Sequence, residues 1–370
     1  MILLTIAVFI AVLGLLVFVH ELGHFVMAKR AGMRVDEFGF GFPPRLFSIR
    51  KGGTTYSINA IPLGGFVKIL GEDGSEISDP QSFANKSHWQ RFSVLVAGVT
   101  MNVILAWVLM SIGMGVGLPT VLDENDQLPR SAIVRNSSVG VLETAPQSPA
   151  ALAGLKAGDV IVEIGGEAIS SIQEAQAVTR SHAGTPTVYT IRRGSATFDA
   201  NITPRVNPPE GEGSLGIALG EIALVSYPWY EVVWRGLLYT VNLLLYTLSA
   251  FWSLIVGVFQ GADVGAALSG PVGIAVLTRD VTRLGFIYLL QFTALLSINL
   301  AIINIIPFPA LDGGRILFLA IEKIRGKKMN PKAEVWANTV GFMFLLLLMV
   351  GVTVHDFDKF NIIGRVRNLF

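Results

Sequence analysis

Four runs of about twenty consecutive apolar residues constrain this chain more than any other feature of its sequence. A helix needs about 20 apolar residues to cross a bilayer core, and 18 or more in a row indicate a transmembrane helix. Charged residues make up only 15% of the 370 residues and apolar residues 52%, whereas an average globular domain carries about 25% charge. The runs predict four transmembrane helices, at Met1–Ala28, Phe92–Leu118, Gly285–Ile306 and Val335–Val354.

The composition also excludes several classes of protein. A disordered chain would need few apolar residues and many charges. The balance of 28 Lys+Arg against 27 Asp+Glu excludes a basic nucleic-acid binder. The absence of cysteine excludes a disulfide scaffold, an iron–sulfur protein, a Cys-ligated zinc site and a cysteine nucleophile. The first apolar run has no basic segment before it and no small-residue cleavage site, so we expect a retained helix rather than a cleaved signal peptide.

The polar stretches between the runs differ in charge and thereby predict an orientation. Lys29–Arg91 holds nine basic and six acidic residues, and Gly313–Glu334 holds six basic and two acidic. Pro119–Glu231 holds seven basic and thirteen acidic residues. Because basic loops stay in the cytoplasm, we expect the first two stretches inside and the acidic stretch outside.

Within the acidic stretch, Ser131–Val206 is predicted to form a small folded module. Its turns contain glycine, and Ile172–Arg180 has a helical pattern. The string SPAALAGLKAGDVIVEIGGEAI at Ser148–Ile169 resembles the central signature of a bacterial PDZ domain; the alternative is an unspecified β-rich module. A PDZ domain would bind an extended peptide as an added strand. The predicted strands are Ala132–Val134, Val160–Ile164, Val188–Ile191 and Phe198–Ile202.

The residues from His20 to His24 read His-Glu-Leu-Gly-His and fit the H-E-x-x-H pattern. Helical residues four apart share one face, so both imidazoles can bind one metal ion. Zinc favours such ligands, and Glu21 between them can act as a general base. The alternative is a chance match. Against it, a charged group inside a span costs about 2.5–3.5 kcal/mol on insertion scales and needs a compensating use.

Asp312 is the best candidate for a third ligand. The other histidines, His88, His182 and His355, lie outside the predicted spans. Asp312 ends the sequence NIIPFPALD directly after the third run, where two prolines break the helix. Such backbone is tolerated at membrane depth only beside protein or water. An Asp-Gly-Gly alone would indicate a polar turn. Here it lies at the cytoplasmic end of the third run, and the HELGH motif lies toward the cytoplasmic end of the first.

A fifth apolar stretch, Val232–Phe259, is expected not to cross the membrane. A single crossing would reverse the direction of Gly285–Ile306 and place Asp312 on the face opposite the HELGH motif. We therefore expect interfacial or partly inserted helices on the outer side. Aromatic residues that suit the headgroup boundary are Trp229, Trp234, Tyr239, Tyr246 and Trp252.

Together, HELGH, NIIPFPALDGG, the PDZ-like module and SGPVGIA at Ser269–Ala275 resemble the site-2 protease family. Within that family the chain resembles the bacterial regulator-of-sigma-E proteases, intramembrane zinc metalloproteases that cut transmembrane anti-sigma factors, and the resemblance covers nearly the whole chain. It implies zinc as cofactor with His20, His24 and Asp312 as ligands. It also implies Glu21 as catalytic base and Asn304 as a residue that contacts or positions substrate.

Thr54–Ile69 predicts two short apolar strands around Pro62 and a Gly64-Gly65 turn. In the family the equivalent segment is a membrane-dipping β-loop that pairs with unwound substrate, so the resemblance implies Gly64 and Gly65 as substrate-binding candidates. An ordinary surface hairpin is the alternative. Asn102 in the second run is a further candidate for substrate binding, or else it packs between helices.

Two departures from the family pattern stand out. Enterobacterial members carry two PDZ domains, whereas this chain has room for one. Arg315 stands where relatives often have a histidine, which is not required as a ligand.

The sequence thus predicts a mainly α-helical membrane protein with four transmembrane helices, an inserted small PDZ-like α/β domain and a membrane-associated β-hairpin loop. The expected parts are residues 1–118 with two helices, HELGH and the β-loop; 119–231 with the PDZ-like domain at about 131–206; 232–284 with interfacial helices; and 285–370 with two helices and the LDGG motif.

The expected function is that of a zinc-dependent intramembrane endopeptidase in regulated intramembrane proteolysis. We expect it in the bacterial cytoplasmic membrane, with both motifs toward the cytoplasm and the PDZ-like domain outside. Its expected partners are single-pass membrane-protein substrates of the anti-sigma-factor or signal-peptide-remnant type, the lipid bilayer and a peptide at the PDZ-like domain, but no nucleic acid. A silent scaffold would be expected to lack Glu21 or a ligand, and a transporter would favour repeated halves. The sequence has neither property.

Overall fold

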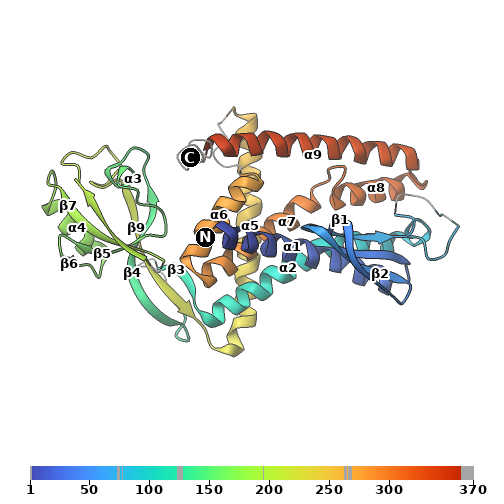
Figure 1. Ribbon diagram of the computed structural model, residues 1–370, viewed down its shortest axis with the longest axis horizontal. Helices are drawn as coiled ribbons and strands as arrows, with labels where there is room; N and C mark the ends of the chain where they lie inside the picture. The colour runs from blue at the N-terminus through green and yellow to red at the C-terminus, as the bar shows by residue number, and fades with distance from the viewer. Residues whose placement is uncertain are drawn as a thin grey trace. The chain divides into compact units, whose positions relative to one another are not determined.

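The computed structural model describes residues 2–72, 76, 78–122, 128–194, 196–261, 265 and 269–359 (Figure 1). The chain forms two compact units, and each is described by itself. The first unit comprises Met1–Leu109, Leu237–Arg279 and Phe292–Phe370, and the second comprises Met110–Gly236 and Asp280–Gln291.

The long helices lie wholly or partly in the first unit. Local signals set several of their ends. Ser87 and Gln90 exchange the two hydrogen bonds of a capping box at the start of the second helix. Gly326, with a φ of 65°, ends the helix Asp312–Arg325 in the left-handed conformation that glycine adopts readily. The helices are α1 (Ile2–Arg30), α2 (His88–Val116), α5 (Trp229–Phe259), α6 (Pro271–Leu284), α7 (Phe286–Ile305), α8 (Asp312–Arg325) and α9 (Pro331–Lys359).

Five of these helices, α1, α2, α5, α7 and α9, are long and apolar enough to cross a membrane. Four of them coincide with the runs that predict spans, but α5 is one continuous helix of 31 residues. The predicted count of four transmembrane helices is therefore not confirmed by length and composition. The charges near the start of α5 do not interrupt the helix because Glu231 and Arg235 pair one turn apart, at 2.5 Å. Within the first unit, α5 runs across the direction of α9 (Figure 1).

The polar stretch between α1 and α2 forms an antiparallel pair of long strands, β1 (Val35–Lys51) and β2 (Thr54–Ile69). Their turn is Gly52-Gly53, whose φ angles of 58° and 79° favour glycine. A short 3-10 helix, Phe83–Asn85, precedes α2.

The pairing within this loop differs from the predicted hairpin. The two halves of β2 do not pair with each other across a Gly64-Gly65 turn. Instead they lie on opposite edges of β1: Phe38 pairs with Tyr56 on one side and with Val67 on the other. The sequence pattern marks both halves as strands but leaves out β1, which supplies the partner for each.

The second unit is built on an antiparallel sheet with strand order β3-β9-β4-β5-β7-β8, and β6 pairs with β5. Two short helices, α3 (Pro149–Leu152) and α4 (Ile172–Ser181), begin at serines whose hydroxyls accept hydrogen bonds from the first turn. The strands are β3 (Leu118–Leu122), β4 (Ile133–Thr144), β5 (Val160–Ile164), β6 (Glu167–Ala168), β7 (Thr187–Arg193), β8 (Ala196–Ile202) and β9 (Ile217–Ser226).

The core of this unit lies between the sheet and α4. Ile161, Tyr189 and Ile191 are buried completely or nearly so. The predicted strands Val160–Ile164, Val188–Ile191 and Phe198–Ile202 fall within β5, β7 and β8, and the predicted helix falls within α4. The predicted strand Ala132–Val134 overlaps only the first two residues of β4, which continues to Thr144. The sequence pattern did not single out β9, which pairs with both β3 and β4.

Candidate metal centre

Helix α1 presents two histidines one turn apart. His20 and His24 are only 7% and 8% exposed, and buried polar groups need partners. The Nδ1 of His24 lies 2.8 Å from the carbonyl oxygen of Val94 on α2. A carbonyl can only accept, so Nδ1 carries the proton and the Nε2 lone pair is left for a metal.

Asp312, the first residue of α8, is placed beside these histidines by a tight turn after α7. A Cβ on Gly313 would overlap the carbonyl oxygen of Ile306, so only glycine fits there. Ala310 has a φ of 78°, and its N–H donates to Oδ1 of Asn338 on α9 at 3.0 Å. The LDGG sequence thus holds the Asp312 carboxylate in a tight turn. A residue with a side chain at position 313 would not fit this turn.

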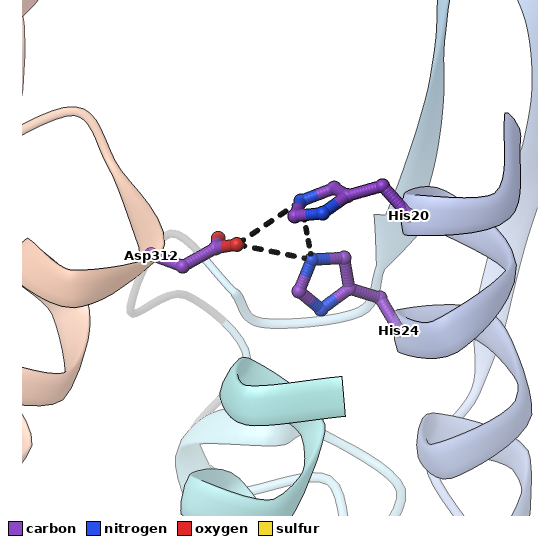
Figure 2. Close-up of side chains that lie close together, drawn as sticks. All are labelled: His20, His24 and Asp312. Atoms are coloured by element: carbon purple, nitrogen blue, oxygen red, sulfur yellow. Dashed lines mark hydrogen bonds and ion pairs between the residues drawn. The ribbon is translucent and has the colours of Figure 1, made fainter. Parts of the chain in front are cut away.

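Three potential ligand atoms converge at this point (Figure 2). The Nε2 atoms of His20 and His24 lie 3.2 Å apart, and Oδ2 of Asp312 lies 3.1 Å from the first and 3.3 Å from the second. In a tetrahedral zinc site with bonds of about 2.0–2.1 Å, neighbouring ligand atoms are about 3.3–3.4 Å apart. In the described ranges this is the one group of three such side chains that could hold a metal ion.

The carboxylate of Asp312 supports the same conclusion. Its Oδ2 is buried and, among described residues, accepts no well-aligned hydrogen bond although two imidazole nitrogens lie close by. Burial favours the neutral acid, but the adjacent imidazoles outweigh burial and hold the pKa of the Asp312 carboxyl below its usual range. Two imidazole nitrogens and one carboxylate oxygen that face a common space fit a divalent cation such as zinc.

Helix α2 forms the opposite side of the centre through Gly98 and Asn102. A Cβ on Gly98 would overlap Nε2 of His24 and come within 2.7 Å of Cε1 of His20. Asn102 is fully buried, with Nδ2 at 3.3 Å from Nδ1 of His20. Its backbone oxygen accepts a hydrogen bond from Ser297 of α7 at 2.7 Å. Sequence reasoning missed Gly98; its spacing of four from Asn102 was the available signal.

The remaining predicted residues also lie near the centre. Nδ2 of Asn304 is 3.5 Å from Nε2 of His20. The β2 strand passes beside the motif, since a Cβ on Gly65 would lie 3.7 Å from Cγ of Glu21. Gly64 precedes it with a φ of 146°. All of these residues belong to the first unit.

The other histidines are not part of this group. His88 begins α2, while the rings of His182 and His355 contact backbone carbonyl oxygens. Arg315 forms an ion pair with Glu72 after the end of β2. The structure therefore places Arg315 beside the β-loop rather than among the three converging atoms.

The chain matches the profile of peptidase family M50 over residues 8–348. It is 32% identical to the zinc metalloprotease RasP of Geobacillus kaustophilus, across 95% of this chain and 97% of that protein. It is 31% identical to the regulator of sigma-W protease RasP of Bacillus subtilis, across 96% and 98%. A solved PDZ domain of the SdrC-like protein from Listeria monocytogenes is 31% identical and covers 24% of this chain and 92% of that one, with a TM-score of 0.21.

Proposed function

Because this chain belongs to peptidase family M50, the site-2 protease family, we propose that it cleaves peptide bonds within transmembrane segments of other membrane proteins. It is a zinc metalloendopeptidase and a multi-pass bacterial membrane protein. The observation that carries the proposal is the convergence of His20, His24 and Asp312 on helices next to or within membrane-spanning segments.

Glu21 is the proposed catalytic base. Zinc, when bound, acts as a Lewis acid that activates water for attack on a peptide carbonyl. Glu21 lies between the two histidine ligands in sequence and within electrostatic range of both and of Asp312. It would take the proton from the attacking water and pass it to the leaving amine.

Asn304 is the proposed donor to the substrate carbonyl. Its side-chain amide lies beside His20 at the centre, and a positioned N–H group can stabilise negative charge that develops on a carbonyl oxygen. Because Asn304 lies near the end of α7, the same turn that holds Asp312 would also fix this amide.

The second half of β2 is proposed to hold the unwound substrate. A helical substrate shields its peptide bonds, so it must become extended before cleavage. From Gly65 to Val67, one edge of β2 pairs with β1, and the described strands leave its other edge unpaired. Gly65 lies next to Glu21, so a substrate strand added to this edge would pass the catalytic base.

Asn102 is proposed to orient His20 rather than to bind substrate. With the amide NH2 facing Nδ1 of His20, Nδ1 would have to accept and Nε2 would carry the proton. Oδ1 of Asn102 is buried and, in the described part of the chain, has no partner. If the oxygen and nitrogen of the Asn102 side-chain amide exchange places, Oδ1 accepts a hydrogen bond from Nδ1 of His20. The proton then lies on Nδ1, and Nε2 of His20 is free for the metal.

The proposed sidedness places the metal centre toward the cytoplasm. The basic loops before α2 and after α7 support this orientation. The course of α5 across the direction of α9 (Figure 1) supports an α5 that lies along one face of the membrane. The PDZ-like module would then lie outside the cell.

The proposed substrates are membrane-anchored regulators of the anti-sigma-factor type, or signal-peptide remnants. The Bacillus subtilis relative is named a regulator of sigma-W protease, and that name supports the first class. Both classes offer a single transmembrane segment that fits the proposed β2 edge.

The PDZ-like module is proposed to bind an extended peptide that tunes access to the centre. A cavity of about 360 Å³ lies between α4 and the start of β9, lined by Thr179, Leu215 and Leu219. Beside it, Ile217–Gly220 of β9 pairs with β4 on one edge, and among the described strands its other edge has no partner, since the described pairing with β3 ends at Glu221. A peptide added to that free edge would continue the line of β3.

A direct test uses the purified full-length chain and a labelled single-pass transmembrane peptide in liposomes. We expect internal cleavage, its loss on zinc chelation and its return on zinc addition. Asp312→Ala should lose both zinc and cleavage. Cleavage that persists in zinc-free protein would contradict the proposal.

A further inference from the structure

A groove of about 540 Å³ runs between α1 and α2, outside the metal centre. Its α1 wall extends from Gly23 to Arg30 and its α2 wall from Trp89 to Ile104. At Gly23 the two helices approach closely, because a Cβ there would overlap the backbone of Ala97. Small residues on both helices therefore hollow out the surface that the groove occupies.

The interior of the groove is apolar although it contains two hydroxyls. Ser93 donates to the carbonyl oxygen of Gln90 and Thr100 to that of Val96, both at 2.9 Å. Each hydroxyl is thus satisfied within its own helix. What remains along the walls is hydrocarbon, from residues such as Met27 and Val96.

The mouth of the groove is cationic and aromatic. Arg30 is exposed in the last turn of α1, and no described carboxylate lies within ion-pair distance of it. Lys29 precedes it. Trp89 is 75% exposed and stacks on Phe92 with ring centroids 5.5 Å apart. Tryptophan at a helix end is typical of the membrane–water interface.

The size of the groove decides what can occupy it. From Trp89 to Ile104 the α2 wall is about 22 Å long at 1.5 Å per residue, about half the thickness of a bilayer with its headgroups. A transmembrane helix of about 10 Å diameter would need on the order of 1,700 Å³ over that length. A single acyl chain is far thinner than a helix and spans one leaflet, so it is the occupant that a groove of this length and volume admits.

We propose that this groove binds one anionic phospholipid, with an acyl chain between α1 and α2 and the phosphate against Arg30. Basic pockets between transmembrane helices on the cytoplasmic side suit acidic headgroups. The proposed sidedness places this lipid in the cytoplasmic leaflet, and the binding of the lipid does not depend on proteolysis.

Native mass spectrometry of the delipidated full-length protein tests this. Phosphatidylglycerol and phosphatidylcholine are titrated separately. We expect one saturable phosphatidylglycerol adduct, bound about fivefold more tightly than phosphatidylcholine, which matches about 1 kcal/mol for a basic residue near an anionic group. Arg30→Gln should abolish this preference. The control Arg50→Gln, at an exposed arginine of β1, should keep it. A preference unchanged by Arg30→Gln would overturn the headgroup assignment.

Thr100→Phe tests the acyl-chain site by filling the groove. We expect Thr100→Phe to weaken the binding of both lipids. Val108→Phe, at an exposed position of α2 outside the groove, should leave the binding of both unchanged. Unchanged binding in Thr100→Phe would overturn the proposal. So would crosslinking of a photoreactive residue at position 100 to a second polypeptide in native membranes, because that result assigns the groove to a protein partner.

Discussion

Gly98 of α2 lies so close to His24 of α1 that any side chain at position 98 would overlap Nε2, the candidate ligand atom. The metal centre therefore depends on an absent Cβ as much as on the side chains that are present. This contact joins α1 and α2 beside the candidate ligands, and the first prediction follows from it.

Gly98→Ala should lower zinc affinity at least about 10–100-fold, the range seen when groups around metal ligands are changed. The added methyl group must displace the His24 ring or separate α1 from α2. Zinc content after dialysis against graded chelator measures the effect. Gly351→Ala is the control, because a Cβ on Gly351 of α9 meets nothing within 4 Å. Equal zinc retention in the two variants would contradict this reading of Gly98.

Glu21→Gln should reduce cleavage about 10²–10⁴-fold, the usual worth of general acid–base help, while zinc stays bound. The amide nearly preserves shape but cannot accept the proton of water. His20→Ala provides the contrast, since it should lose zinc together with activity. Near-normal turnover by Glu21→Gln would rule out the proposed base.

Asn102→Ala should weaken zinc binding about 10–100-fold, whereas Asn102→Asp should restore most of it. A carboxylate, like the amide oxygen, accepts the Nδ1 proton of His20 and leaves Nε2 for the metal. Zinc affinity together with the imidazole tautomer from NMR is the readout. If alanine and aspartate have the same effect, Asn102 only packs between the helices.

Leu219→Trp should fill the cavity beside α4 and abolish binding of extended peptides to the PDZ-like module. Cleavage of a bare transmembrane peptide should stay within about twofold, because the module holds no residue of the metal centre. Val188→Trp on β7 is the matched control, since Val188 is exposed in the same module and is not among the residues that line the cavity. Loss of bare-peptide cleavage in folded Leu219→Trp would contradict a tuning role.

Single cysteines at Tyr230 and Gln260, both exposed at the two ends of α5, should react with an impermeant thiol reagent from the same side of the membrane. The chain has no cysteine of its own, so each signal reports one position. A single crossing by α5 would place Asp312 opposite the HELGH motif in the proposed topology. Labelling from opposite sides would therefore refute the proposed sidedness.

The sequence by itself determined the parts of this protein that depend on local periodicity. Apolar runs of sufficient length can satisfy their backbone in lipid only as helices, and so α1, α2, α7 and α9 lie where the runs predict them. The spacing of His20 and His24 places both on one helical face. The PDZ-like strands and α4 follow from short alternating runs and their turns.

Only the tertiary structure decided how these parts meet. The position of Asp312 beside α1, the fit of Gly98 against His24 and the contact of Asn102 with His20 depend on how neighbouring helices are rotated and shifted against each other. The pairing of both halves of β2 with β1 depends in the same way on a partner strand whose own pattern is irregular. The periodicity of a segment reports only the environment of that one helix or strand. Contacts between elements depend on packing, which many sequences could satisfy in different ways. That is why His20, His24 and Asp312 could be proposed as ligands from the sequence, whereas the close approach of Gly98 to His24 could not be foreseen.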